Sequence, residues 1–167
     1  MSEPVERARA VMAELAKRET VEVMVSFYGF ALQEEDDTQV PVPFPEARDE
    51  SWQRPLLSVF DKRLDFESAG HSHEATLVFG LWTAEPPLDD TECWEAQREA
   101  GIHSTSGALT VETVSGAGGG RVELGAADSS WTVRAYCSGR AEVARRAPVE
   151  VPEGVERYLV QLWPACV

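Results

Sequence analysis

The chain has 167 residues, of which 43% are hydrophobic, and its 29 acidic residues outnumber 15 basic ones, giving a formal net charge of −14. This composition is typical of a globular protein with an apolar core and argues against a disordered chain. The shortage of Lys and Arg argues against direct nucleic-acid binding, because phosphate contacts need basic side chains. No apolar run is long enough to span a membrane.

The first residues predict a helix, and the cysteines indicate the cellular compartment of the protein. Residues 3–18 follow a helical pattern, in which Ser2 suits the capping position and Pro4 the first turn. We expect a short N-terminal helix, within 1–19, that packs on the rest of the protein or binds a partner. The segment lacks the apolar centre of a signal peptide. Three distant cysteines without a CxxC pair indicate a reduced, cytoplasmic environment; they are Cys93, Cys137 and Cys166.

From residue 21 the apolar period changes to two, which predicts β-strands. In the first strand, Val21, Val23, Val25 and Phe27 share one face. Turn-rich segments separate the later strands, and residues 92–101 are expected to form a short helical turn. The further strand candidates are 56–60, 75–82, 108–114, 121–124, 131–137 and 157–163.

These elements predict a mainly β fold, an antiparallel β-sandwich of about seven to eight strands with a short N-terminal helix. We expect a single domain over 1–167, with the helix in 1–19 and the sandwich in 20–167. The segments 131–137 and 157–163 are expected to be interior strands. The residues expected to face the core from them are Trp131, Val133, Ala135, Tyr158, Val160 and Leu162.

Motifs for catalysis or metal binding are weak. His71 and His73 would share one face of a strand, as metal ligands do, but no carboxylate follows at the spacing of a cupin motif. We therefore expect a polar turn leading into a strand at Ala75, and no metal. Cys137 closes an apolar strand and is expected to be buried. The glycine run 116–120 lacks the end of a phosphate loop and indicates a flexible hairpin turn. We expect no enzyme and no cofactor.

Two acidic runs contain aromatic residues, as a protein interface with a central aromatic anchor does. They are the candidate partner-binding surface, and the alternative is that they are solvated loops whose aromatic residues plug the core. The candidates in the first run are Glu34, Glu35, Asp36, Asp37, Phe44, Glu46, Asp49, Glu50 and Trp52. Those in the second run are Asp89, Asp90, Glu92 and Trp94.

The opening strand VSFYGFALQEED and the closing pair WTVRAYCSGRAEVA and VERYLVQLWPA resemble a group of small bacterial β-sandwich proteins. That group includes the competence-protein-J-type nuclease inhibitors and related immunity-like proteins. The resemblance implies a cytosolic inhibitor or immunity protein, without a catalytic motif, that blocks a basic nuclease or other toxin. The N-terminal helix and the Pro-rich acidic insert at 33–55 depart from the group. The alternatives are a small-molecule or glycan-binding module, marked by an aromatic cleft with few charges, and a structural accessory protein.

Overall fold

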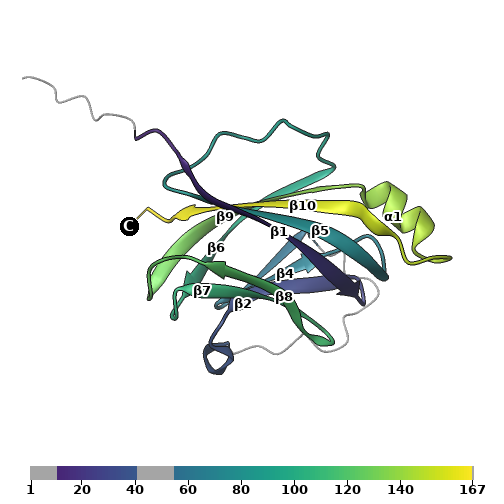
Figure 1. The fold of residues 1–167 in the computed structure, drawn as a ribbon, viewed down its shortest axis with the longest axis horizontal. Helices are drawn as coiled ribbons and strands as arrows, with labels where there is room; N and C mark the ends of the chain where they lie inside the picture. Colours follow the sequence, from purple (N-terminus) through teal and green to yellow (C-terminus); the bar gives the residue numbers. More distant parts are fainter. Residues whose placement is uncertain (1–10, 41–54, 167) are drawn as a thin grey trace, which may run out of the picture.

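The computed structural model describes residues 11–40 and 55–166, and most of their regular structure is β-strand (Figure 1). The elements in chain order are β1 (Leu15–Ser26), β2 (Gly29–Glu34), the 3-10 helix η1 (Asp37–Gln39), β3 (Leu57–Phe60), β4 (Arg63–Glu67), β5 (Ser72–Trp82), β6 (Ala96–Ser104), β7 (Ala108–Thr113), β8 (Gly116–Glu123), β9 (Ser129–Ser138), α1 (Arg140–Arg146) and β10 (Glu153–Pro164).

The strands form one ten-stranded sheet that curls until it is nearly closed (Figure 1). Its order is β3-β4-β2-β1-β5-β10-β9-β6, and β7 pairs with β2 and with β8. The two ends of that path, β3 and β6, lie in contact. Among the described pairings, β5 with β10 is parallel and the others are antiparallel. The mainly β class is confirmed, but a barrel-like sheet replaces the expected sandwich, because β2 pairs with both β4 and β7 and continues through a turn into β1.

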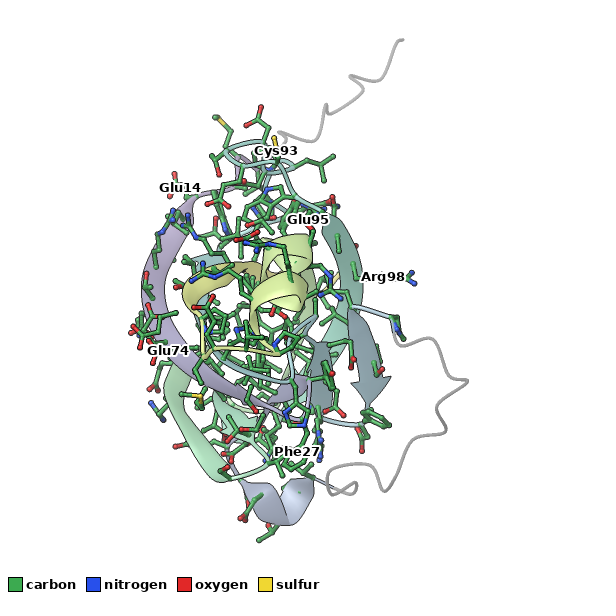
Figure 2. The ribbon with its side chains drawn as sticks, turned by 90° about the vertical axis from the view of Figure 1, so that its right-hand side faces the viewer. Glu14, Phe27, Glu74, Cys93, Glu95 and Arg98 are labelled. Carbon is green, nitrogen blue, oxygen red and sulfur yellow. The ribbon has the colours of Figure 1, made fainter. Side chains whose placement is uncertain are left out.

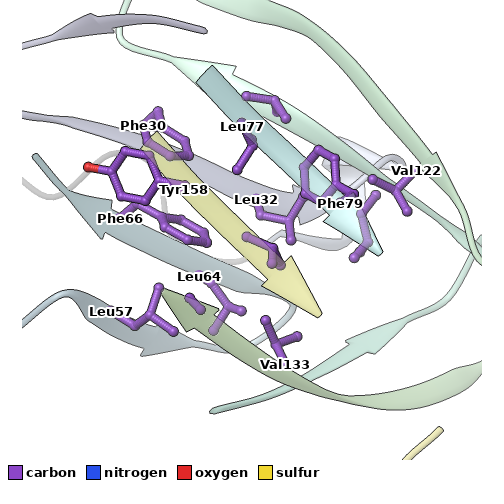
Figure 3. Close-up of a cluster of buried hydrophobic side chains, with 14 of the residues drawn as sticks. Phe30, Leu32, Leu57, Leu64, Phe66, Leu77, Phe79, Val122, Val133 and Tyr158 are labelled. Carbon is purple, nitrogen blue, oxygen red and sulfur yellow. The ribbon is translucent and has the colours of Figure 1, made fainter. Parts of the chain in front are cut away.

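Each strand sends alternate side chains into one core inside the curled sheet (Figure 3). Three aromatic rings of this core lie together on one side of it (Figure 3). Phe30 stacks on Phe66 with ring centroids 4.8 Å apart, and Tyr158 meets both edge-on, at 5.1 and 5.8 Å. Such aromatic pairs stabilise by about 0.5–1.5 kcal/mol each beyond their buried area. The core therefore links β2, β4 and β10, which lie apart in the sequence.

The expected arrangement of the two closing strands is confirmed. β10 lies between β5 and β9, and β9 lies between β10 and β6, so both are interior strands. Leu162 pairs with Val133 and Val160 with Ala135. The six side chains expected to face the core are all buried. Residues on the other face are also buried in part, since Arg134, Tyr136, Gln161 and Trp163 are each at most 5% exposed.

The described part of the expected N-terminal helix is not helical. Residues 1–10 lie outside the described residues, 11–14 are irregular, and β1 begins at Leu15. Its pairing with β5 runs from Leu15 opposite Trp82 to Ser26 opposite Ser72. Met12 and Leu15, two apolar residues of the predicted helix, are 84% and 44% exposed. The long backbone ladder to β5 thus outweighs the helix propensity of these residues.

Other elements differ from the sequence pattern as well. The expected helical turn at 92–101 is wrong, because Ala96–Ser104 is a strand that pairs with β9 along its length. The strand β4 and the helix α1 are not predicted either, and the opening strand expected through residues 25–36 is divided by a turn into β1 and β2. Gly139 begins α1 with a φ of 76°, which suits glycine because it has no Cβ. No helix in the described part of the chain has the length and apolar character needed to cross a membrane.

The glycine run 116–120 is also not the flexible turn expected of it. It belongs to β8, and the turn before it falls at 114–115. A Cβ added at Gly118 would lie 2.9 Å from Val111 Cγ1, and one at Gly120 would lie 3.1 Å from Val21 Cγ1. The glycines therefore allow β8 to pass close to the side chains of β7 and β1.

Candidate protein-binding surface

The second acidic run, residues 85–95, covers the outer face of β9 and β10. The backbone amide of Asp89 donates to the Tyr136 hydroxyl at 2.9 Å, and its carboxylate accepts from Trp94 Nε1 at 3.0 Å. The Trp94 ring packs on Tyr136 with centroids 5.3 Å apart. Burial alone would raise the pKa of Asp89, but hydrogen bonds from Thr91 and Trp94 outweigh it and lower that pKa. Asp89 and Trp94 hold this segment on the outer face of the sheet, and Trp94 does not enter the core.

Arg134 is the basic residue beneath the same segment. Its guanidinium is nearly enclosed, lies 2.7 Å from Glu85 and 3.1 Å from Glu99, and donates to the carbonyl of Pro86 at 3.0 Å. It also lies 4.8 Å above the ring of Trp163. Burial would lower the pKa of Arg134, but hydrogen bonds to the two carboxylates raise it. The arginine therefore stays charged and neutralises part of the acidic run.

The end of the segment is fastened in the same way. Glu92 accepts from the Ser138 hydroxyl at 2.9 Å and pairs with Arg157 at 2.8 Å. Glu95 accepts from the first two backbone amides of α1, where the helix dipole favours a negative charge. Of the four residues of this run expected to meet a partner, Asp90 alone is exposed.

Glu34, in the first acidic run, is buried, so the expectation that it meets a partner is wrong. Its carboxylate accepts from the hydroxyl of Ser104 at 2.8 Å and from the backbone amides of Thr105, Ser106 and Asp36 at 2.6, 3.1 and 3.0 Å. Burial would raise its pKa, but these hydrogen bonds outweigh that effect and lower it to about 2. Glu34 therefore stabilises the loop between β6 and β7.

The rest of the first run is divided between internal contacts and the surface. Glu35 forms a two-pronged ion pair with Arg121 at 2.8 and 2.9 Å. Asp36 accepts from the Thr38 amide at 3.2 Å and begins η1, the dark blue coil at the bottom of Figure 1. Asp36 and Asp37 are exposed. The remaining candidates of this run lie outside the described residues: Phe44, Glu46, Asp49, Glu50 and Trp52.

A cleft of about 290 Å³ lies near η1, at the end of β3, β6 and β9. Lys62, on its edge, reaches Gln39 of η1 at 3.4 Å. Inside it, His103 lies 2.9 Å from both Ser130 Oγ and the carboxylate of Asp128. Asp128 is 85% exposed and thus hydrated, unlike the buried acid that orients the histidine of a catalytic triad. The other lining residues are Phe60, Asp61, Gly101, Ile102, Trp131, Thr132 and Ala165.

The tryptophans of the described residues do not form an open aromatic cleft. Trp131 and Trp163 are buried, and Trp82 and Trp94 are half-buried. The cleft near η1 has charged residues on its edge. The feature expected of a glycan-binding or small-molecule module is therefore absent from the part of the chain that the structure describes.

The two neighbouring histidines lie in different surroundings. His73 is buried in β5, with Nε2 2.7 Å from Ser68 Oγ and 3.2 Å from the carboxylate of Glu156. Because Ser68 and Glu156 contact the same nitrogen, the three do not form a triad. His71 is exposed and precedes the strand, which begins at Ser72 rather than at Ala75. Among the described residues, no three His, Cys, Asp or Glu side chains converge as metal ligands would.

The cysteines are free thiols in the described structure. Cys137 is buried as expected, and its burial raises the pKa to about 12, so that the reactive thiolate does not form near neutral pH. Cys93 and Cys166 are exposed. Neither the buried thiol nor the histidines provide an activated nucleophile.

Neither a protein-family model nor a curated protein matches the sequence. Solved structures with the same fold include ComJ from Bacillus subtilis, which inhibits the DNA degrading activity of NucA. It matches with a TM-score of 0.58 and 14% identity over 92% of this chain and 99% of its own. The product of crocagin biosynthetic gene J matches with a TM-score of 0.61 and 13% identity, over 90% and 99%. The resemblance found in the end strands is thus confirmed as a shared fold.

Proposed function

We propose that the protein is a cytoplasmic inhibitor that binds and blocks a basic protein partner, such as a nuclease, without catalysis of its own. The observation that carries the proposal is the fold shared with ComJ over 92% of the chain. The net charge of −14 agrees with it. A surface that binds DNA is positively charged, and an acidic protein is attracted to such a surface over a long range.

The exposed carboxylates near η1 are the first part of the proposed surface. Asp36 caps η1 and Asp37 is its first residue, Asp61 lies in the turn between β3 and β4, and Asp128 precedes β9. Charges at the rim of an interface act mainly on the rate of association, so this end would guide the partner toward the inhibitor. We also assign to the surface Asp90 and the acidic, Pro-rich residues beyond Val40, including Phe44 and Trp52.

Inhibition of nucleases tests this function directly. We would produce each nuclease encoded in the genome from which the protein comes, add NucA, and measure DNA degradation while the protein is titrated in. We expect stoichiometric inhibition of at least one of them. The apparent affinity should fall by about tenfold or more as salt rises from low to high concentration, because exposed charges are screened within about 10 Å at 0.1 M salt.

Full activity of every nuclease at a tenfold molar excess of the protein would contradict the proposal. So would inhibition by the heat-denatured protein, since a flexible polyanion competes with DNA for a basic surface without any fold. Polyglutamate of equal charge is the matched control for that effect. Inhibition by the folded protein alone would support a specific interface.

A further inference from the structure

The turn between β1 and β2 holds two large aromatic residues in a backbone conformation that residues with a Cβ avoid. Phe27 has a φ of 52° and Tyr28 a φ of 63°. Ser26 pairs with Gly29 around them, so the turn is a two-residue hairpin loop. Such loops favour Asn and Gly, because both central residues need a positive φ. An aromatic pair at these positions is an outlier that calls for a reason outside backbone preference.

Burial does not provide that reason. Phe27 is 64% exposed and Tyr28 is 42% exposed. The prediction that Phe27 shares a strand face with the buried Val23 and Val25 is wrong, because β1 ends at Ser26. Both rings meet the exposed ring of His71 edge-on, with centroids 5.0 and 5.1 Å away. The backbone is held firmly: Tyr28 N donates to the His71 carbonyl, and the amide of Ser68 donates to the Tyr28 carbonyl at 2.8 Å. The turn thus presents two aromatic rings to solvent on a backbone that hydrogen bonds hold in place.

Two carboxylates without an ion pair among the described residues lie on the strands that lead to this turn, two ladder positions before β1 ends. Met24, 49% exposed on β1, pairs with Glu74 on β5, and Glu74 pairs in turn with Glu153 on β10. Neighbouring like charges on a sheet repel each other. None of the described basic side chains forms an ion pair with Glu74 or Glu153, and Arg157, further along β10, is paired with Glu92. Phe27 lies at the lower end of the molecule in Figure 2, and Glu74 lies higher along the sheet.

We infer that Phe27 and Tyr28, with the neighbouring Met24, Glu74 and Glu153, form the anchor by which the protein holds an arginine-bearing segment of its protein partner. This inference rests on the proposed function and names the contact surface. A guanidinium stacks on an aromatic face and pairs with a carboxylate at the same time. The strained turn and the repelling carboxylates both destabilise the free protein. A bound cation would offset the repulsion, and rigid rings reduce the ordering needed on binding.

The first experiment compares variants in the inhibition assay, with the nuclease that the wild type inhibits. We expect Phe27→Gly to weaken inhibition about 30-fold, as loss of an aromatic hot spot does. Its Tm should nevertheless rise, because glycine adopts the positive φ without strain. Glu74→Gln combined with Glu153→Gln should weaken inhibition about tenfold at low salt and less at high salt. The matched controls are Leu88→Ala, of similar exposure at 66%, and Glu14→Gln, an exposed carboxylate that lies far from Phe27 in Figure 2.

A purely structural role of Phe27 would lower the Tm of Phe27→Gly and leave inhibition by the folded variant unchanged. Unchanged inhibition by Phe27→Gly would therefore overturn the anchor while leaving the proposed function intact. Equal weakening by Leu88→Ala would also overturn it, because the loss would not be specific to the turn.

The second experiment needs no nuclease. The peptide acetyl-Gly-Arg-Gly-Arg-Gly-amide is titrated into the protein and followed by NMR. We expect the largest shifts at Phe27, Tyr28, His71 and Glu74, and their loss in Phe27→Gly. Shifts that are as large at Asp37, or that persist in the variant, would overturn the anchor. If the wild type inhibits no nuclease but binds the peptide at the turn, the proposed function fails and the anchor stands.

Discussion

Two acidic regions of this protein use their charge in opposite ways. In the segment 85–95, Glu85, Glu92 and Glu95 each meet an arginine, a hydroxyl or the amides of a helix, and the segment is fastened to the sheet. On the outer face of β1, β5 and β10, Glu74 and Glu153 lie side by side, and none of the described basic side chains pairs with them. A dense acidic run in the sequence therefore need not be a free acidic surface, and two isolated glutamates can form one.

The difference lies in the donors within reach of each carboxylate. The acidic segment crosses two strands that carry Arg134 and Arg157 on their outer faces, so its charges are neutralised where they lie. The strands β1 and β5 offer no such donor beside Glu74 among the described residues. If this contrast is correct, variants of the first region should affect mainly stability. Variants of the second should affect stability little or raise it.

The largest effect on the free energy of unfolding is expected at Arg134, which lies on β9 beneath the segment 85–95. Arg134→Ala should lower the free energy of unfolding by about 3–4 kcal/mol, because it removes a buried charge and leaves its partners without a donor. Urea unfolding measures the loss, and Trp94 fluorescence reports whether the segment detaches. Arg98→Ala is the control, because Arg98 is exposed on β6 (Figure 2) and should change stability by less than about 0.5 kcal/mol. An equal loss in both variants would contradict the role of Arg134.

Glu34 should stabilise the fold, as the paired acidic residues of the segment 85–95 do, although it lies in the first acidic run. Its pKa is about 2, below its ordinary value of 4.5, so its stabilising contribution is present above pH 4.5 and is lost as the pH falls toward 2. Glu34→Gln should lower the free energy of unfolding by about 2–3 kcal/mol at pH 7 and make stability less sensitive to pH between 4.5 and 2. Asp37→Asn, on the exposed surface, is the control. If both variants show the same acid unfolding as the wild type, the buried contacts of Glu34 do not stabilise the fold.

A substitution in the aromatic turn should increase the free energy of unfolding, whereas the two substitutions above should lower it. Phe27→Gly should raise the free energy of unfolding by about 1 kcal/mol, because glycine removes the penalty of a positive φ. Val59→Gly, at a similarly exposed strand position without a positive φ, should lower it by about 0.5–1 kcal/mol. Thermal and urea unfolding measure both. A loss of stability in Phe27→Gly would mean that the ring contacts with His71 outweigh the backbone strain.

The smallest effect is expected where the two free glutamates meet. Glu153→Gln should raise the free energy of unfolding by about 0.2–0.5 kcal/mol at low salt, because it removes repulsion from Glu74, and the gain should vanish at high salt. Glu99→Gln should instead lower it, since Glu99 pairs with Arg134. Urea unfolding at two salt concentrations checks the signs. If Glu153→Gln and Glu99→Gln changed the free energy of unfolding in the same direction, the distinction between the two regions would be wrong.

The sequence predicts most where one face of a strand is buried along its whole length. Trp131, Val133 and Ala135 face the core from β9, and the residues between them lie on the other face, where Arg134 and Tyr136 are buried as well. Prediction from the sequence fails at β6, an edge strand. Its polar side chains remain largely exposed, so that no apolar alternation marks it. It also fails at Phe27, because the apolar alternation of β1 continues by one step into the turn.

The candidate site was harder to predict than the fold because its distinctions depend on distant partners. The run EEDD gives no sign that Glu34 is buried and Asp37 exposed. The donors to Glu34 lie about seventy residues further along the chain, at Ser104 to Ser106. The turn does leave a local signal: SFYGF places two aromatic residues between strands, where turn residues are expected.

The position of β10 has a consequence for the synthesis of this protein. It is the last strand of the described chain, yet it lies in the middle of the sheet between β5 and β9. A ribosome-bound chain that still lacks residues 153–164 exposes the unpaired edges of both neighbours, together with the apolar side chains that β10 would cover. Such edges pair readily with other chains. Fragments that end before β10 should therefore be prone to aggregation.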